Sequence, residues 1–141
     1  MIAEDCIFCR IAGGSAPAFR VFEDGQTVAF LDIRPAALGH TLVVPRLHSA
    51  DLLHSAREDL EATVRTTQRV ARGLNSLLEP DGIRVSQFNG AAAGQTVFHY
   101  HVHVVPVQAG TRPGLHGRDE ASPDALEQLA ARLREAIETP W

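Results

Sequence analysis

The sequence predicts a single α+β domain, in which an antiparallel sheet of about five strands packs with one long helix and a C-terminal helix. Three observations support this. A chain of 141 residues with 45% apolar and 21% charged residues is typical of one globular domain that buries about 70 per cent of its unfolded surface. Short apolar, β-branched segments recur, and Asp24-Gly25 between two of them is typical of a hairpin turn. Two longer segments carry apolar residues at helical spacing, and each is expected to form a helix.

The first half of the chain is expected to hold a short helix and three strands. The helix covers residues 7–12 and ends at Gly13-Gly14. The strands are expected at 21–23, 27–32 and 41–44. Asp24-Gly25 joins the first two of these strands, and a loop over residues 35–39 precedes the third.

The second half begins with the long helix, expected at residues 57–78 and ended by Pro80-Asp81-Gly82. The positions of its inward face recur every three or four residues: Leu60, Val64, Thr67, Val70, Ala71, Leu74 and Leu77-Leu78. Two further strands are expected at 83–88 and 98–105. Residues 108–121 contain Gly, Arg and Pro and are interpreted as a mobile link.

The last helix begins at Ser122-Pro123-Asp124, where a serine N-cap, a proline at the first position and an early acid coincide. Its inward positions are predicted to be Leu126, Leu129, Leu133 and Ile137. We therefore divide the chain into a main domain at 1–108 and, at 109–141, a linker and helix that pack on the same domain.

Composition narrows the function classes. The net charge of −4 gives no basis for a nucleic-acid partner. The chain has no apolar run of about 20 residues that would span a membrane. Residues 1–5 are acidic and lack the basic and apolar regions of a secretory leader. A cytoplasmic protein with no nucleic-acid and no membrane partner is expected.

The most informative segment is the histidine-rich stretch at residues 95–106. His99, His101 and His103 alternate with apolar residues, so a strand here would place three imidazoles on one face. Such a row is interpreted in three ways. It is a metal site, a site of acid–base or nucleophilic catalysis, or a solvated strand face without a task.

A loop of small residues, 89–96, leads into this stretch and favours phosphate chemistry. Its glycines allow close backbone approach to a ligand, and its amides can form an anion-binding nest. The side chains of Asn89, Gln95 and Thr96 add hydrogen-bond donors, and the Gly94 amide lies beside them in sequence. Asn89 is expected either to bind phosphate or to position the loop. Together with the histidines, this loop is predicted to hold a phosphate-sized anion.

Four segments in order resemble the histidine-triad (HIT) family. The triad segment Gln-Thr-Val-Phe-His-Tyr-His-Val-His-Val-Val matches the family's pattern of three histidines separated by apolar residues. The others are Cys6–Ile11, Phe30–Pro35 and Gly39–His48. The resemblance covers roughly residues 5–108 and is strongest to the Hint-like branch of small bacterial HIT hydrolases. It implies a HIT-like fold, nucleotide hydrolysis and a homodimer.

The predicted reaction is cleavage at the α-phosphate of a nucleotide, either a nucleoside phosphoramidate or a dinucleoside polyphosphate. His101 is predicted to attack phosphorus and form a covalent nucleotidyl-histidine that water then hydrolyses. His103 should donate to a phosphate oxygen, and His40 should orient the triad or relay a proton. Thr96 stands where the family often has serine, which bears on the choice of leaving group.

The nucleoside pocket is inferred from the same resemblance. Asp32 is expected to accept hydrogen bonds from the ribose hydroxyls, although its position before Arg34-Pro35 also fits a turn-capping role. The base is expected between the apolar side chains Phe8, Ile11, Phe30, Leu31 and Ile33. Stacking without base-edge donors predicts loose selectivity that favours purines.

The two cysteines, Cys6 and Cys9, are a redox pair, half of a zinc site or packed thiols. A redox motif should follow a strand. Only five residues precede Cys6, so the redox interpretation is disfavoured. His48 is the leading third ligand for zinc, and the resemblance supports His99 as the fourth, besides its place in the catalytic triad. This zinc would be structural and not required for the chemical step.

Two alternative functions stay open. One is a metal-dependent hydrolase that uses His99, His101 and His103 as catalytic ligands. The other is a nucleotide-binding module whose hydrolysis is incidental.

Overall fold

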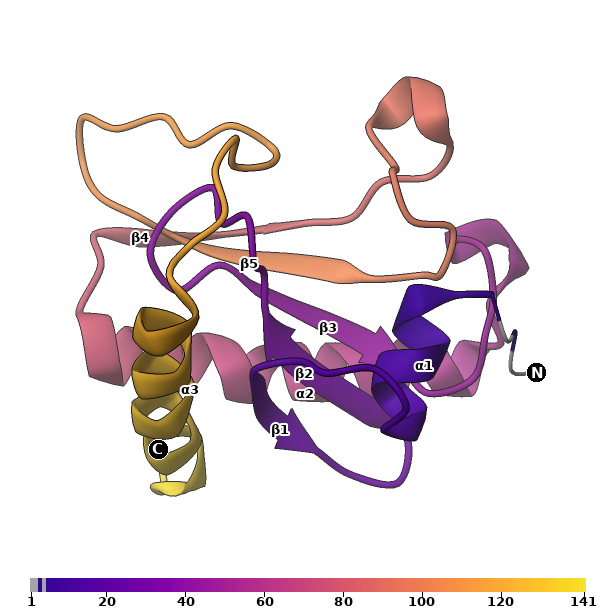
Figure 1. Ribbon diagram of the computed structural model, residues 1–141, viewed down its shortest axis with the longest axis horizontal. Coiled ribbons are helices and arrows are strands. Elements are labelled where there is room, and N and C mark those ends of the chain that lie inside the picture. Colours follow the sequence, from indigo (N-terminus) through magenta and orange to yellow (C-terminus); the bar gives the residue numbers. More distant parts are fainter. Residues whose placement is uncertain (1–2, 4) are drawn as a thin grey trace.

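A five-stranded antiparallel sheet forms the centre of the computed structural model, in the order β1-β2-β3-β5-β4 (Figure 1). The strands are β1 (Arg20–Glu23), β2 (Thr27–Leu31), β3 (Thr41–Pro45), β4 (Gly82–Ser86) and β5 (Val102–Val107). The helices are α1 (Ile7–Gly13), α2 (Arg57–Leu78) and α3 (Pro123–Glu138), with short 3₁₀ turns at Leu52–His54 and Ala91–Ala93. The predicted α+β fold class is confirmed.

The structure describes residue 3 and residues 5–141. Residues 1, 2 and 4, part of the acidic start in which no leader is expected, lie outside the described residues. Among the described residues, no helix combines the length and apolar character needed to cross a bilayer.

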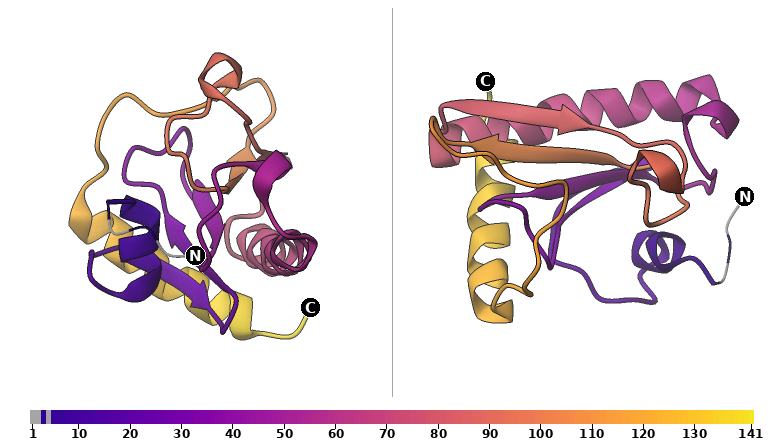
Figure 2. Two further views of the ribbon diagram at one scale, coloured as in Figure 1. Left: turned by 90° about the vertical axis from the view of Figure 1, so that its right-hand side faces the viewer. Right: turned by 90° about the horizontal axis from the view of Figure 1, so that it is seen from above.

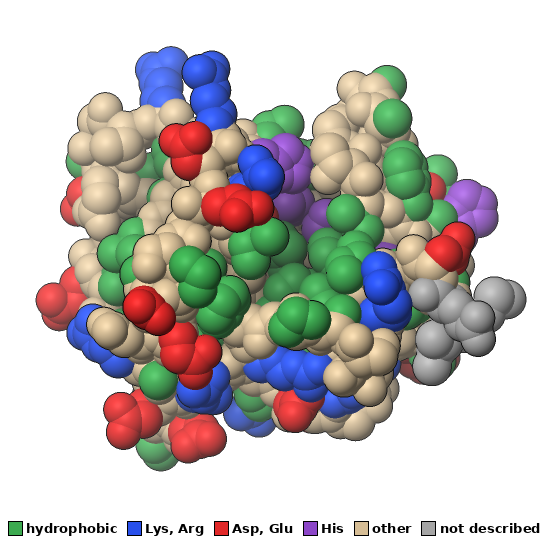
Figure 3. Space-filling model, viewed as in Figure 1, with side chains coloured by type: hydrophobic (Ala, Val, Ile, Leu, Met, Phe, Trp, Pro, Cys, Tyr) green, Lys and Arg blue, Asp and Glu red, His purple; other side chains and the backbone are tan. Residues whose placement is uncertain are grey.

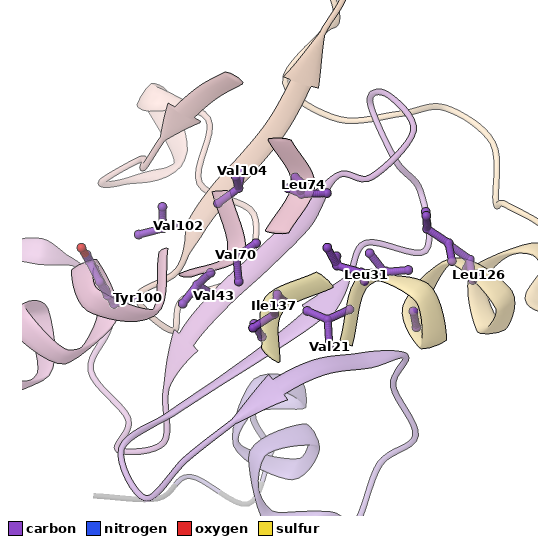
Figure 4. Packing of buried hydrophobic residues seen from close by; sticks show 14 residues of the cluster. Val21, Leu31, Val43, Val70, Leu74, Tyr100, Val102, Val104, Leu126 and Ile137 are labelled. Carbon is purple, nitrogen blue, oxygen red and sulfur yellow. The ribbon is translucent and has the colours of Figure 1, made fainter. Parts of the chain in front are cut away.

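The helices cover both faces of the sheet (Figure 2). One apolar cluster joins α2 and α3 to the inner residues of β2, β3 and β5, and Figure 4 shows its side chains interdigitating between these elements. A second, smaller cluster lies under α1, where Phe8 and Ile11 pack on Phe30 and Leu42. Because residues alternate along a strand, β2 contributes Ala29 and Leu31 to the first cluster and Phe30 to the second.

The long helix agrees with its predicted bounds, but its buried face differs at one position. Val70 and Leu74 are fully buried, whereas Val64 is 63% exposed. Thr67 is buried as its spacing predicts, and Thr63 is buried in place of Val64. The hydroxyl of Thr67 donates to the carbonyl oxygen of Thr63 at 2.7 Å, and that of Thr63 donates to the carbonyl oxygen of Asp59 at 2.7 Å. These internal hydrogen bonds let threonines occupy core positions.

Two strand boundaries also differ from the prediction. The strand expected at 83–88 is β4 and ends at Ser86. The strand expected at 98–105 begins at Val102, and residues 98–101 are irregular. The backbone N–H of Tyr100 donates to the carbonyl of Ser49 at 2.8 Å, not to a neighbouring strand, so the ladder does not extend over this stretch.

The expected mobile link between β5 and α3 is held by hydrogen bonds to β4 and to the loop that follows β2. The guanidinium of Arg84 donates to the carbonyl oxygens of Pro113 and Gly114 at 2.8 and 2.7 Å. The N–H of Gly117 donates to the carbonyl of Arg34 at 3.0 Å. These contacts fix the segment beside the pocket described below, so its interpretation as a mobile link is wrong.

Candidate functional site

A pocket of about 430 Å³ opens between α1, the ends of β2 and β3, and the triad segment, a volume within the usual range for a small-molecule site. Its wall is mainly apolar: Ile7, Phe8, Ile11, Pro17, Ala18, Phe30, Leu31, Ile33, Leu42 and Val97. Its polar residues are Asp32, Arg34, Thr96, His101, His103 and His116, with Gly117 beside them. Figure 3 shows histidines gathered in a hollow above apolar side chains.

His101 presents a free nitrogen to this pocket. Its Nδ1 lies 2.7 Å from the carbonyl oxygen of His99. A carbonyl only accepts, so Nδ1 carries the hydrogen and, in the neutral ring, Nε2 keeps its lone pair. The ring is 5% exposed and packs edge-on against Phe8, with centroids 5.1 Å apart. A nitrogen with a free lone pair therefore lines the pocket in a fixed orientation.

A chain of hydrogen bonds fixes the opposite tautomer in His103. The backbone N–H of Ala36 donates to Nδ1 of His40 at 3.0 Å, so neutral His40 carries its hydrogen on Nε2. That Nε2 lies 2.9 Å from Nδ1 of His103 and donates to it. The hydrogen of His103 is then on Nε2, a buried atom without a partner among the described residues. An unpartnered donor beside the lone pair of His101 is suited to an anionic oxygen.

Burial keeps these imidazoles neutral. It lowers the pKa of His103 to about 3 and the pKa of His40 to about 4, and the nearby Asp32 carboxylate opposes the shift of the His40 pKa. Burial also lowers the pKa of His101, against the hydrogen bond to the His99 carbonyl, which raises it. The neutral tautomers assigned above therefore hold at pH 7.

Asp32 has two contacts that bear on its predicted role. Its Oδ1 accepts from the N–H of Arg34 at 2.8 Å, which is the turn-capping contact that the sequence also allowed. Its Oδ2 lies 3.6 Å from Nε2 of His40, and the residue lines the pocket. The carboxylate is thus anchored by one oxygen at the polar edge of the pocket.

Most of the predicted base-binding residues line the apolar wall. Phe8, Ile11, Phe30 and Ile33 are among them. Leu31 borders the pocket, but its side chain packs in the core cluster of α2 and α3, on the other face of β2. The sequence did not indicate the remaining wall residues, which are Ile7, Pro17, Ala18, Leu42, Val97 and, on the polar side, Arg34, His116 and Gly117. Ile7, Arg34, Leu42 and Val97 lie within the segments that resemble the family but were not singled out there, whereas Pro17, Ala18, His116 and Gly117 lie in loops outside those segments.

The small-residue loop divides into one pocket residue and three supporting residues. Thr96 lines the pocket as expected. The Gln95 side chain is buried: its amide donates to the carbonyls of Ala50 and Val97, and its oxygen accepts from Gly90 N–H.

Asn89 and Gly94 lie outside the pocket. The side-chain oxygen of Asn89 accepts from the N–H of Leu52 at 2.8 Å. Gly94 has a φ of +107° and lies against Leu115 and Phe88, so it serves the turn. The structure therefore does not bring Gln95 or Gly94 to the pocket, and both support the loop instead. Of the two roles expected of Asn89, its hydrogen bond to Leu52 corresponds to positioning the loop.

A second cluster lies behind the triad, where Cys6, Cys9, His48 and His99 meet. His99 Nε2 lies 2.7 Å from the carbonyl oxygen of Pro45, so its hydrogen is on Nε2 and its Nδ1 lone pair faces the thiols. The strand expected to carry all three imidazoles is shorter than predicted, because residues 99 and 101 precede β5 and only His103 lies on it. His99 does not line the pocket; its carbonyl, not its ring, contacts His101.

The spacing of the four side chains fits a tetrahedral zinc ion. Sulfur and nitrogen ligands at ordinary zinc distances are about 3.6 Å apart. His99 Nδ1 lies 3.4 and 3.5 Å from the two sulfurs, of Cys6 and Cys9, and His48 Nδ1 lies 3.5 Å from the sulfur of Cys9. The Pro45 carbonyl that holds His99 is the kind of partner that orients metal-bound histidines.

A second group, Asp32, His40 and His103, also gathers possible metal ligands. The distance between its two histidines is that of a hydrogen bond and not that of two ligands of one metal ion. Two nitrogen ligands of one zinc ion would be about 3.3 Å apart. The nitrogens of His40 and His103 are 2.9 Å apart, which is the usual length of a hydrogen bond. The triad side of the pocket therefore offers a hydrogen-bonded pair, and the cysteine side offers the metal-ligating group.

The sequence of this chain is similar to those of known proteins. The model of the HIT domain family matches residues 14–110. A HIT-like protein of Mycobacterium tuberculosis is 45% identical over 136 residues, which cover 94% of this chain and 92% of that protein. Adenylylsulfatase HINT3 of Arabidopsis thaliana is 31% identical over 105 residues, which cover 74% of this chain and 53% of that protein.

Solved structures are similar over nearly the whole chain. A Hit-like protein from Bartonella henselae has a TM-score of 0.90 at 36% identity, covering 95% of this chain and 97% of the other. A zinc-bound histidine triad family protein from Mycobacterium smegmatis has a TM-score of 0.83 at 38% identity, covering 94% and 93%. A hypothetical histidine triad nucleotide-binding protein from Sulfolobus tokodaii has a TM-score of 0.86 at 33% identity, covering 94% and 92%.

Proposed function

This chain belongs to the histidine-triad (HIT) family, and from that premise we propose that it binds a nucleotide in the apolar pocket and cleaves the bond between its α-phosphate and the leaving group. The single observation that carries the proposal is the set of hydrogen-bond partners that assigns opposite tautomers to two neighbouring imidazoles. His101 offers a lone pair and His103 offers an N–H, and their ring centroids are 4.9 Å apart.

The reaction has two steps. The lone pair on Nε2 of His101 attacks phosphorus, and the leaving group departs with the electron pair of the bond that breaks. An amine leaving group takes a proton from bulk water as it departs, and the water molecule consumed in the second step returns a proton to bulk water. Attack makes the imidazole ring cationic, and the carbonyl oxygen of His99, which already accepts from Nδ1 at 2.7 Å, stabilises that charge. Water then attacks the nucleotidyl-histidine, loses a proton, and releases a nucleoside monophosphate with His101 restored.

The donor on His103 stabilises the phosphoryl oxygens during both steps. Negative charge on these oxygens must be held by donors that are in place before the reaction. His40 fixes the donor orientation of His103 through the 2.9 Å hydrogen bond between their rings, so His40 is a positioning residue. The Thr96 hydroxyl, which also lines the pocket, supplies a further donor near the phosphoryl group or leaving group.

The nucleoside occupies the apolar part of the pocket. Asp32, at its polar edge, is proposed to accept hydrogen bonds from the ribose hydroxyls. Phe8, Ile11, Phe30 and Ile33 line the wall where the base would stack. Such a wall offers area and few base-edge donors, so we propose loose base selectivity with purine nucleotides preferred.

The substrate is proposed to be a nucleoside phosphoramidate, a dinucleoside polyphosphate or a related nucleotide with another leaving group. The name of the Arabidopsis thaliana relative, adenylylsulfatase, supports adenylyl compounds as the class to test first. Similarity to the Sulfolobus tokodaii protein, which is named as nucleotide-binding, supports a nucleotide in this pocket.

We further propose that Cys6, Cys9, His48 and His99 hold a structural zinc ion. The sulfur–nitrogen distances of 3.4 to 3.5 Å and the zinc-bound relative from Mycobacterium smegmatis support this. When bound, such an ion ties the segment before α1 to the triad segment. Its four ligands stand outside the pocket lining, so the chemical step does not need it. A homodimer in the cytoplasm, without nucleic-acid or membrane partners, remains a prediction.

The test compares hydrolysis of adenosine 5′-phosphoramidate, a diadenosine polyphosphate and adenylyl sulfate by wild type, His101→Ala and His54→Ala. His54 is an exposed histidine paired with Asp51 and serves as the matched control. We expect turnover by wild type and His54→Ala, loss in His101→Ala, and an adenylyl adduct on His101 after rapid alkaline quenching, because the N–P bond of such an adduct is labile in acid and stable in alkali.

Two results would contradict the proposal in different ways. Activity that a chelator abolishes while the protein stays folded would favour a metal-dependent hydrolase. Tight adenosine monophosphate binding without turnover of any of the three substrates would favour a binding module. Turnover that persists after chelation supports the covalent histidine mechanism.

A further inference from the structure

The segment that follows β5 brings an additional histidine to the pocket. We call residues 111–121 the C-terminal strap. His116 at its centre lines the pocket together with His101 and His103, and its ring centroid is 5.4 Å from that of His103. The ring is exposed, so it faces both the pocket and solvent. The histidine hollow in Figure 3 lies between the protruding strap and the protruding loop before β5.

The strap is anchored on both sides of His116. Before it, the Arg84 guanidinium holds the carbonyls of residues 113 and 114 at 2.8 and 2.7 Å. After it, the N–H of Gly117 donates to the carbonyl of Arg34 at 3.0 Å, and the N–H of Ala121 donates to the carbonyl of Ile33 at 2.9 Å. With hydrogen bonds on either side, the backbone at His116 is fixed relative to the Asp32 edge of the pocket.

The close approach at Gly117 is specific to glycine. A Cβ atom added there would lie 2.1 Å from the carbonyl oxygen of Pro35 and 2.8 Å from that of Arg34. Backbone on both sides cannot yield as a flexible side chain would. Any larger residue at this position must therefore lift the strap and move His116 away from His103.

A phosphoryl group at the site would lie within reach of His116. The unpartnered Nε2–H of His103 must face the phosphoryl oxygens if His101 attacks phosphorus, and the His116 ring stands edge-on beside that of His103, at an interplanar angle of 72°. The proximity of His116 is also one of the causes, after burial, that lower the pKa of His101 and of His103. His103 supplies one neutral donor, which leaves other oxygens of the phosphoryl group to be bound.

We propose that His116 is a further substrate-binding residue, which donates a hydrogen bond to a non-bridging oxygen of the nucleotide's α-phosphoryl group, and that the docked strap holds it there. This inference rests on the proposed function, because it needs the phosphoryl group between His101 and His103. It gives the strap a part in recognising the phosphoryl group, in addition to covering the sheet end.

The test measures the affinity of the zinc-loaded protein for adenosine monophosphate and for adenosine by calorimetry. The two ligands differ only by the phosphoryl group. The variants are His116→Ala, His116→Gln, Gly117→Ala and the control His54→Ala. A hydrogen bond to a charged group at a solvent-accessible site contributes about tenfold in affinity. We expect His116→Ala to bind adenosine monophosphate about tenfold more weakly, with adenosine affinity unchanged. Gly117→Ala should weaken adenosine monophosphate at least as much, and it should also affect adenosine if the lifted strap reshapes the edge of the pocket that Gly117 lines. His116→Gln keeps an N–H donor and should lose about threefold or less.

Each other outcome overturns a stated part of the reasoning. If wild type prefers adenosine monophosphate over adenosine and His116→Ala keeps that preference, the role of His116 is wrong while the proposed function stands. If wild type does not distinguish the two ligands, the phosphoryl site, and with it both proposals, is wrong. If His116→Ala weakens both ligands equally, His116 acts on the pocket shape and not on the phosphoryl group. Thermal melting of each variant establishes that it is folded.

Discussion

Replacing His40 by phenylalanine should release the tautomer of His103. The two rings are 1% and 2% exposed, and their nitrogens are 2.9 Å apart. Phenylalanine keeps a ring of similar size but has no donor, so Nδ1 of His103 loses its partner in a buried place. Leaving such an acceptor unpaired costs about 1 to 3 kcal/mol of stability. The Nε2–H form of His103 loses the same stabilisation relative to the Nδ1–H form. A loss of about 1.4 to 2.7 kcal/mol of transition-state stabilisation, which lies within this range, corresponds to a 10- to 100-fold lower kcat/KM.

Nitrogen NMR of the imidazole rings measures the cause directly. In the wild type we expect His101 as the Nδ1–H tautomer and His40 and His103 as Nε2–H tautomers, because their partners are a carbonyl oxygen, a backbone N–H and a ring nitrogen in turn. In His40→Phe, the His103 signals should shift toward a mixture of tautomers. Hydrolysis of adenosine 5′-phosphoramidate and the urea midpoint give the two magnitudes.

The wild-type spectrum alone can refute this reasoning. If His103 carries its hydrogen on Nδ1, then His40 does not donate to it, and the assigned donor on Nε2 of His103 does not exist. In the variant, an unchanged His103 tautomer together with a kcat/KM within twofold of wild type would show that His40 does not position His103.

Three further predictions concern stability. Cys9→Ala, or a chelator on the wild type, should lower the melting temperature, and added zinc should restore it only for the wild type; equal melting with and without zinc would contradict the metal site. Burial lowers the pKa of His40 in the folded protein to about 4, from an ordinary value of 6.5. Below pH 6.5 the unfolded chain therefore binds more protons at His40 than the folded protein does. Stability should be constant above pH 7 and fall between pH 6.5 and 4, by up to about 3 kcal/mol for this group; urea midpoints that stay level over this range would contradict it. Gly73→Ala places a Cβ 2.6 Å from Cγ1 of Ile137 and should lower stability by about 1 to 2 kcal/mol despite the better helix propensity of alanine. The control Gly13→Ala, whose Cβ meets nothing within 4 Å, should not lower it.

The fold could be predicted because its elements carry local signals. The Asp24-Gly25 turn, the helix 57–78 and the serine-proline start of α3 all appear near their expected places. The failure at residues 98–101 has a physical cause. Alternating histidines and apolar residues satisfy the pattern of a strand, but the His99 carbonyl accepts from the ring of His101 and Tyr100 N–H donates to Ser49. Local alternation cannot reveal that the backbone bonds elsewhere.

The site could be predicted where a residue type has few structural uses. Buried histidines and paired cysteines are such types, and His101, His103, His40, Cys6 and Cys9 all lie in the clusters expected of them. Amide side chains are different, because they satisfy loop backbone as readily as they bind phosphate.

Gln95 and Asn89 illustrate this ambiguity. Gln95 bonds Gly90, Ala50 and Val97, and Asn89 bonds Leu52. Sequence alone gives no measure of how many backbone donors and acceptors a loop leaves for such side chains to satisfy.

The strap was misjudged for a further reason, which concerns distance along the chain. Its glycines, prolines and charged residues are those of an exposed linker, and nothing within the segment marks it as docked. The signal lies in Arg84 and Arg34, whose side chain and backbone capture the strap from about 30 and 80 residues away. Gly117 becomes informative only when the carbonyls of Arg34 and Pro35 stand beside it. A linker composition therefore does not exclude a part in the site, and such segments near a pocket should be judged by which distant backbone groups remain to be satisfied.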